Sequence, residues 1–107
     1  MGQEPRLTLA TRAVLHVLAD GDTGHFGLQI AKQTGLPTGT VYPILVRLMQ
    51  AGWLEDDWED IDPTVEQRPP RRFYRLTAKG RLRVEAFLSS RGTLVPGWQA
   101  QPGRLIP

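Results

Sequence analysis

Residues 34–53 read TGLPTGTVYPILVRLMQAGW, and the fold of the chain is decided within this stretch. Gly35 suits the left-handed conformation that ends a helix, and Pro37 prevents that helix from continuing. Apolar residues then follow at helical spacing, which predicts one buried stripe on a second helix. Its members are Val41, Leu45 and Leu48, with Ile44 beside them. Two helices separated by a tight turn are the pattern of a helix-turn-helix.

The second of these helices is expected to begin at Gly39 or Thr40, capped by the hydroxyl of Thr38 or Thr40. Pro43 would then lie in the first turn, where the backbone N–H has no intrahelical partner to lose. Several side chains remain mostly off the apolar stripe: Thr38, Thr40, Tyr42, Val46 and Arg47.

Two blocks of sequence form a pair around this predicted helix. Residues 38–43 read TGTVYP and are followed by Leu45, Arg47-Leu48 and Gly52-Trp53-Leu54, while residues 68–80 read RPPRRFYRLTAKG. Together the blocks resemble the recognition helix, the wing strand and the start of the last helix of PadR-type transcriptional regulators. The resemblance covers residues 7–88, and the pairing of the two blocks disfavours other winged-helix families such as MarR-like regulators.

The predicted fold is mainly α-helical with a small β-hairpin (α+β), a winged helix-turn-helix. Three N-terminal helices are expected at residues 7–19, 28–34 and 39–50, followed by a two-stranded wing at residues 53–58 and 71–76. The domain organisation predicted is a flexible N-terminus (1–6), a winged helix-turn-helix DNA-binding domain (7–76), a C-terminal dimerisation helix (77–91) and a Pro/Gly-containing tail (92–107).

The first two helices are each expected to bury one face. In the first, Thr8 is the predicted cap, and the inward stripe is Leu7, Ala10, Val14, Val17 and Leu18. Leu9, Ala13 and Leu15 lie outside that stripe and are expected to cover more of the core or to meet a partner. In the second helix the inward residues are Leu28, Ile30 and Ala31.

Charge is distributed in two blocks, although the net charge is only +2. Residues 55–66 hold seven acids and no base, and residues 68–83 hold seven bases and no acid. The blocks could be two solvated faces, or a hairpin with ion pairs between its strands. A basic strand beside a helix-turn-helix favours phosphate binding by residues 68–72. If the acids neutralise the arginines instead, the wing contributes little.

Double-stranded DNA is the partner that the resemblance implies. The N-terminus of the second helix offers unpaired N–H groups and the positive end of the helix dipole, which suit a phosphate. Lys32 could equally be an ordinary solvated lysine. The predicted DNA-binding residues are Gly27, Lys32, Thr38, Gly39, Thr40, Tyr42, Pro43, Arg47, Arg68, Arg71 and Arg72.

The last helix, 78–90, is predicted to start at a Thr77 cap and to carry apolar residues on two sides. Val84, Phe87 and Leu88 form one stripe, and Leu82 and Ala86 lie nearly opposite. Either the helix is wedged in its own core, or the second side is covered by another copy of the chain. The predicted dimer interface is Leu9, Leu15, Val84, Phe87 and Leu88, and Trp98 is a candidate ligand contact.

Other classes of function find no support in the sequence. No cysteine is present, which excludes disulfides and thiolate metal sites. The two histidines, His16 and His25, have no acids at ligand spacing, and no nucleophile motif occurs, so neither a metal site, a cofactor nor an enzyme is expected. With no apolar run long enough to span a membrane and no signal peptide, a cytoplasmic protein is expected.

The function expected is sequence-specific DNA binding by a homodimeric PadR-like repressor on a pseudo-palindromic operator. A small aromatic effector is implied by the same resemblance. The alternative is a winged helix that binds another protein and no DNA, because Arg47 is the only charge on the predicted recognition helix.

Overall fold

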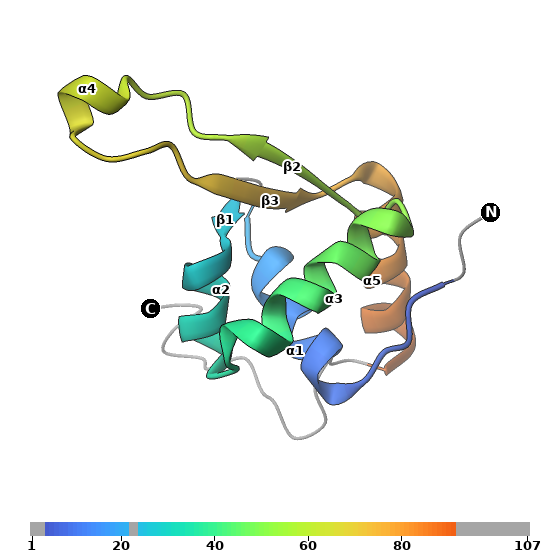
Figure 1. Cartoon of the computed structure of the whole chain (residues 1–107). Helices are drawn as coiled ribbons and strands as arrows, with labels where there is room; N and C mark the ends of the chain where they lie inside the picture. Colours follow the sequence, from blue (N-terminus) through green and yellow to red (C-terminus); the bar gives the residue numbers. More distant parts are fainter. Residues whose placement is uncertain (1–3, 22–23, 92–107) are drawn as a thin grey trace, which may run out of the picture.

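The computed structural model describes residues 4–21 and 24–91, with side chains as far as Phe87. It confirms the winged helix-turn-helix, in which a group of helices carries a long β-hairpin that projects to one side (Figure 1). The elements in order are α1 (Leu9–Leu18), β1 (His25–Phe26), α2 (Gly27–Thr34), α3 (Thr38–Gln50), β2 (Leu54–Trp58), α4 (Pro63–Glu66), β3 (Arg72–Leu76) and α5 (Ala78–Arg91).

The sheet has three strands in the order β1-β3-β2, all antiparallel, whereas the sequence predicted only two. The missing strand is β1, in which His25 pairs with Tyr74 and Phe26 with Phe73. A strand of two residues is too short to show an alternating pattern, so it could be recognised only from its pairing.

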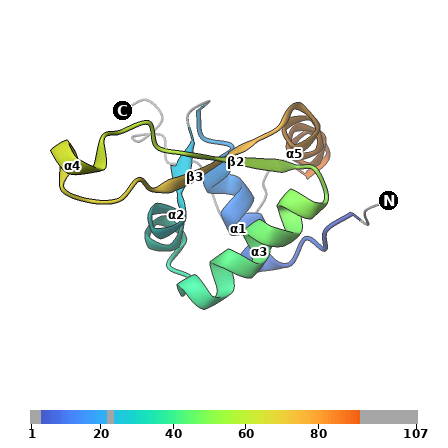
Figure 2. The same cartoon turned by 45° about the horizontal axis from the view of Figure 1, so that its top comes forward.

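The core lies where α1, α2 and α3 meet beneath the sheet, as Figure 2 shows. Thr8 caps α1 as predicted, with its hydroxyl accepting from the N–H of Thr11 at 3.1 Å. The largest fully buried side chains are Val14, Leu15, Leu18, Ile30, Val41, Leu45 and Leu48. The stripe predicted on α3 is confirmed.

Two predictions about helix faces are wrong. Leu15 was expected either to cover more of the core or to meet a partner; its side chain is 1% exposed within the core of its own chain, so its assignment to a dimer interface is wrong. Leu28 was expected to face inward, but it is 63% exposed. The buried residues of α2, which begins at Gly27 and is only eight residues long, are Gly27, Ile30 and Ala31.

The turn between α2 and α3 is built by Gly35, whose φ of 76° is the left-handed conformation predicted. Its N–H donates to the carbonyl of Ala31 at 2.9 Å. The cap of α3 differs from the prediction, because Pro37 is the N-cap and no side chain caps the helix. The carbonyl of Pro37 accepts from the N–H groups of Thr40 and Val41 at 2.9 and 3.0 Å, so the helix begins at Thr38.

This earlier start changes the place of Pro43, which lies inside α3 and not in its first turn. A proline at this position leaves the carbonyl of Gly39 without its helical donor. Both Gly39 and Pro43 are exposed, so water can take the place of that donor.

Thr77 joins the end of α3, the start of β2 and the start of α5. Its hydroxyl accepts from the N–H of Gly80 at 3.0 Å, which confirms the predicted cap, and donates to the carbonyl of Gly52 at 2.6 Å. Gly80 packs directly on the main chain of Trp53, where any side chain would collide with the Trp53 carbonyl. This contact sets the position of α5 against the sheet.

The loop between β2 and β3 contains a short helix, α4, which the sequence did not predict. The carboxylate of Asp62 accepts from the N–H of Thr64 at 2.9 Å, and Pro63 occupies the first turn. Gln67 ends the helix in a left-handed conformation, with φ of 58°. The loop is therefore ordered by its own local contacts at the far end of the hairpin (Figure 1).

The final helix packs against its own chain through the stripe that was predicted to form a dimer. Val84 is 2% exposed and belongs to the monomer core, so it is not available to a second copy. Phe87 is half-buried, with the guanidinium of Arg12 at 5.2 Å from its ring centre. The opposite face of α5 is open, since Leu82 is 64% exposed. The side chain of Leu88 and the whole of Trp98 lie outside the described residues.

Among the described residues no helix combines the length and the apolar character needed to cross a membrane.

Candidate nucleic-acid interface

The exposed face of α3 follows from its buried one. With Val41, Ile44, Leu45 and Leu48 turned into the core, the helix presents its opposite side to solvent. The exposed residues of α3 are Thr38, Gly39, Tyr42, Pro43, Val46, Arg47 and Gln50. All the predicted contacts on this helix are among them except Thr40, which is half-buried. Val46 and Gln50 are exposed as well, although they were not among the predicted DNA contacts. Their position off the apolar stripe could have identified them from the sequence.

Tyr42 is held in place by Gly27 at the start of α2. A Cβ atom on Gly27 would lie 2.5 to 2.6 Å from the ring and hydroxyl of Tyr42, so only glycine leaves room for that ring. Gly27 itself is buried, which corrects the prediction that it contacts DNA. Its role in the structure is to seat Tyr42, which is 40% exposed.

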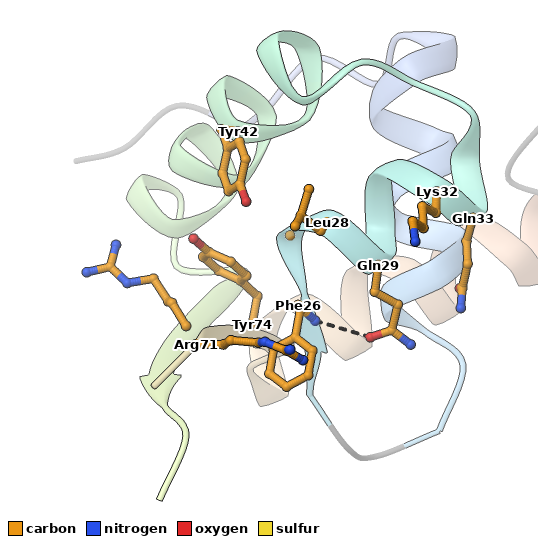
Figure 3. Close-up of a pocket in the computed structure, with 10 residues that line it drawn as sticks. Phe26, Leu28, Gln29, Lys32, Gln33, Tyr42, Arg71 and Tyr74 are labelled. Carbon is orange, nitrogen blue, oxygen red and sulfur yellow. Dashed lines mark hydrogen bonds between the residues drawn. The ribbon is translucent and has the colours of Figure 1, made fainter. Parts of the chain in front are cut away.

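A groove of about 820 Å³ runs between α2, α3 and β3. In Figure 3, Tyr42 from α3 and Tyr74 from β3 point into the same space, and the side chain of Arg71 lies across Phe26. Burial raises the pKa of Tyr74 above the ordinary value of a tyrosine. The lining residues are Phe26, Gly27, Leu28, Gln29, Lys32, Gln33, Tyr42, Arg71, Arg72 and Tyr74.

Three of the wing arginines are paired with acids. Arg72 contacts the carboxylate of Asp56 at 3.1 Å, and its guanidinium lies 4.9 Å from the ring centre of Trp58. Arg75 contacts Glu55 at 3.0 Å, which is one of the cross-strand ion pairs that the sequence left open as an alternative. The register of the hairpin, with Glu55 opposite Arg75 and Trp58 opposite Arg72, brings the two charge blocks together.

Arg68 and Glu59 form the shortest of these ion pairs. The two terminal guanidinium nitrogens of Arg68, Nη1 and Nη2, donate to the two carboxylate oxygens of Glu59 at 2.7 and 3.0 Å. The hydrogen bonds from Arg68 lower the pKa of Glu59 to about 2, so the carboxylate is charged at neutral pH. Hence Arg68 and Arg72, both predicted DNA contacts, already have partners within the wing.

Arg71 differs from its neighbours. Its guanidinium lies 5.4 Å from the ring centre of Phe26, and within the described part of the chain no acid forms an ion pair with it. Its main-chain N–H donates to Glu59 at 3.1 Å, which fixes the backbone there. The stacked guanidinium feels the charge of Glu59 but makes no ion pair with it, so of the wing arginines in the described residues Arg71 is the one most available to an anion. Phe26 was missed from the sequence, because its role depends on β1 pairing with β3.

Three cations near the exposed face of α3 have no ion pair within the described residues. Lys32 on α2 and Arg71 line the groove, and Arg47 is exposed on α3. No group of His, Cys, Asp and Glu able to hold a metal ion occurs within residues 4–21 and 24–91. The arrangement is chemically suited to bind an anion beside a largely uncharged helix face.

Comparison with known proteins gives a consistent result. Residues 14–86 match the model of the transcriptional regulator PadR-like family. A PadR family transcription regulator from Clostridium difficile is 20% identical, with a TM-score of 0.65 over 78% of this chain and 86% of the other. A PadR-like regulator from Bacillus cereus is 21% identical, with a TM-score of 0.63 over 78% and 82%.

A third solved structure, BpsR of Bordetella bronchiseptica, has its DNA binding regulated by 6-hydroxynicotinic acid. It is 21% identical, with a TM-score of 0.68 over 94% of this chain and 69% of the other. At these identities the solved structures show the shared winged-helix fold. No curated protein gives a significant match. Because the family model spans most of the chain, this protein belongs to the PadR-like family of DNA-binding transcriptional regulators, which are not enzymes.

Proposed function

We propose that this protein represses transcription by binding a pseudo-palindromic operator as a homodimer. The observation that carries the proposal is the grouping of the exposed face of α3 with two available cations, Lys32 and Arg71, around one groove. A helix of this kind fits the major groove, and cations beside it neutralise the flanking phosphates.

The wing takes a smaller part in this proposal than the sequence suggested. Arg68, Arg72 and Arg75 are neutralised by acids of the same hairpin, so their attraction for phosphate is reduced. The exposed acids Asp57 and Asp60 would repel DNA. We therefore assign the phosphate contact of the wing to Arg71 alone, which directly precedes β3 and lies beside Phe26.

The experiment that tests DNA binding is fluorescence anisotropy with labelled duplexes at several salt concentrations. Neutralising a few phosphates releases counterions, so log K should fall linearly with log salt with a slope of about −0.9 per contact. A winged helix that binds only proteins would show neither saturable binding nor this slope. That result would end the proposal.

Dimerisation is proposed through the open side of α5. Leu82 and Leu9 are 64% and 61% exposed, although both are large apolar side chains. Burying them against a second copy would remove that area from water. A two-fold dimer presents two copies of α3, which requires an operator with matching half-sites. In this proposal residues 77–91 form the dimerisation helix, and residues 7–76 form the DNA-binding domain.

Sedimentation at micromolar concentration tests the dimer. We expect Leu82→Asp to give a monomer that binds operator weakly. The matched control is Val65→Asp on α4, since Val65 is 72% exposed but lies on the wing. A dimer that survives Leu82→Asp would place the interface elsewhere. Transcription in vitro with and without the protein, on promoters selected by footprinting, distinguishes repression from activation.

A small aromatic effector is proposed for the groove beside Tyr42. Phe26, Tyr42 and Tyr74 supply aromatic walls, and Arg71 supplies a cation for an acid group. A compound bound there would compete with DNA for Arg71. Displacement of labelled DNA by a small aromatic acid tests this, with 6-hydroxynicotinic acid, the regulator of BpsR, as first probe. If such acids bind but Arg71→Ala leaves their affinity unchanged, the groove is not their site.

A further inference from the structure

The middle of the exposed face of α3 is nearly free of hydrogen-bonding side chains. At 100° per residue, Gly39, Pro43, Val46 and Gln50 fall within an arc of about 60°. Thr38 and Tyr42 lie on one flank of this arc, and Arg47 lies on the other. We call Gly39, Pro43 and Val46 the apolar ridge of α3.

The apolar ridge is exposed without a structural reason in the free protein. Val46 is 46% exposed in the middle of the helix, and Pro43 is exposed although a proline weakens a helix interior. Gly39 has open space around it, since a Cβ atom there would meet nothing within 4 Å. Neither the folding nor the capping of α3 therefore requires these three residues.

A base edge offers one apolar group to such a ridge. In the major groove the donors and acceptors of the bases are polar, and only thymine presents a methyl group. Val46 and Pro43 have no hydrogen bond to offer a base, but both can bury a methyl group against carbon. Gly39, which has no side chain, allows the N-terminal part of the helix to approach the base edges closely.

We propose that the apolar ridge selects thymine, with Val46 as the residue that contacts its methyl group and Gly39 as the residue that permits the approach. This inference rests on the proposed DNA binding and names the base that the recognition helix reads. Arg47, at the flank, is left to contact the backbone or a neighbouring base pair.

The test begins with selection of bound sequences from random duplexes by the unmodified protein. Each thymine of the selected site is then replaced by deoxyuridine, which removes only the methyl group. We expect a loss of about fourfold in affinity at the thymine under Val46, the effect of one buried methyl group. In Val46→Ala the same replacement should cost almost nothing, because the contact has already been removed. Val65→Ala, on the wing, is the control that should retain the full methyl effect.

A second variant tests the close approach. Gly39→Ala adds a methyl group in open space on a helix, so it should keep or raise the melting temperature. It should lower the affinity for the selected site by about tenfold or more, because lifting the helix weakens several base contacts at once. Unchanged affinity in Gly39→Ala would show that α3 does not approach the bases at its N-terminal end.

The outcomes separate this inference from the function on which it rests. If no sequence is enriched and binding has no salt dependence, the proposed function fails. If a sequence is enriched but deoxyuridine has no effect, or has the same effect in Val46→Ala, DNA binding stands and the inference is overturned. Enrichment of guanine that disappears in Arg47→Ala, without a methyl effect, would assign the reading to Arg47 instead.

Discussion

The guanidinium of Arg68 holds both carboxylate oxygens of Glu59, at 2.7 and 3.0 Å, across the base of the wing loop. One of those oxygens also accepts from the N–H of Arg71 at 3.1 Å. A single carboxylate thus anchors the chain on both sides of Pro69-Pro70, and it fixes the backbone of the residue whose side chain stacks on Phe26.

This anchor gives the wing a defined response to pH. The pKa of Glu59 falls from 4.5 to about 2 in the folded state, first through the hydrogen bonds from Arg68. A carboxylate with a lowered pKa contributes stability that is fully present above pH 4.5 and is lost as the pH falls through about 2. We expect the protection factor of the Arg71 amide against hydrogen exchange, which is corrected for the intrinsic pH dependence of the rate, to fall over this window, and Glu59→Gln to show the lowered protection already at pH 7. Asp60→Asn, an exposed neighbour, should behave as the unmodified protein.

Arg71 and Arg72 should contribute unequally to DNA binding, although they are adjacent in sequence. Arg71→Ala should lower the slope of log K against log salt by about one, the effect of one lost phosphate contact. Arg72→Ala should change the slope less, because Asp56 at 3.1 Å already neutralises it. Asp56→Asn would release Arg72 and should strengthen binding. Equal slopes for both alanine variants would contradict this assignment.

Gly27 and Tyr42 should act as one unit in DNA binding. Gly27→Ala places a methyl group against the Tyr42 ring and displaces it, so the affinity should fall about as far as in Tyr42→Ala. The double variant should be no weaker than either single variant, since both remove the same contact. Anisotropy titrations of the three variants with DNA give the coupling free energy between Gly27 and Tyr42. A melting temperature that drops in Tyr42→Ala as in a core variant would place this ring in the core instead.

Leu15→Ala and Val84→Ala should destabilise the monomer. Both side chains are buried in the core of one chain, and truncating such a leucine costs about 2–5 kcal/mol. The decrease in the free energy of unfolding should not depend on protein concentration, whereas the effect of losing a dimer contact would depend on it. Urea denaturation curves recorded at two protein concentrations measure this loss of stability. Val65→Ala, at an exposed position, should change the free energy of unfolding by less than about 0.5 kcal/mol.

Local patterns explain which parts of this structure were predictable. The caps at Thr8 and Thr77 and the turn at Gly35 depend on neighbouring residues, and all three were predicted. The buried stripe of α3 follows from helical periodicity. The candidate site was predictable to the same extent, because a helix that buries Val41 and Leu45 must expose Tyr42 and Val46.

The sequence by itself determined the helix-turn-helix, the wing and the family, because short-range periodicity and turn residues encode them. The tertiary structure alone decided the rest, and in each case the reason is a contact between distant residues. β1 exists because His25 pairs with Tyr74, and the space left by Gly27 seats Tyr42. The register of β2 and β3 decided which arginines meet acids, and it left Arg71 available on Phe26. A one-residue shift of that register would have exchanged these partners without changing a single amino acid.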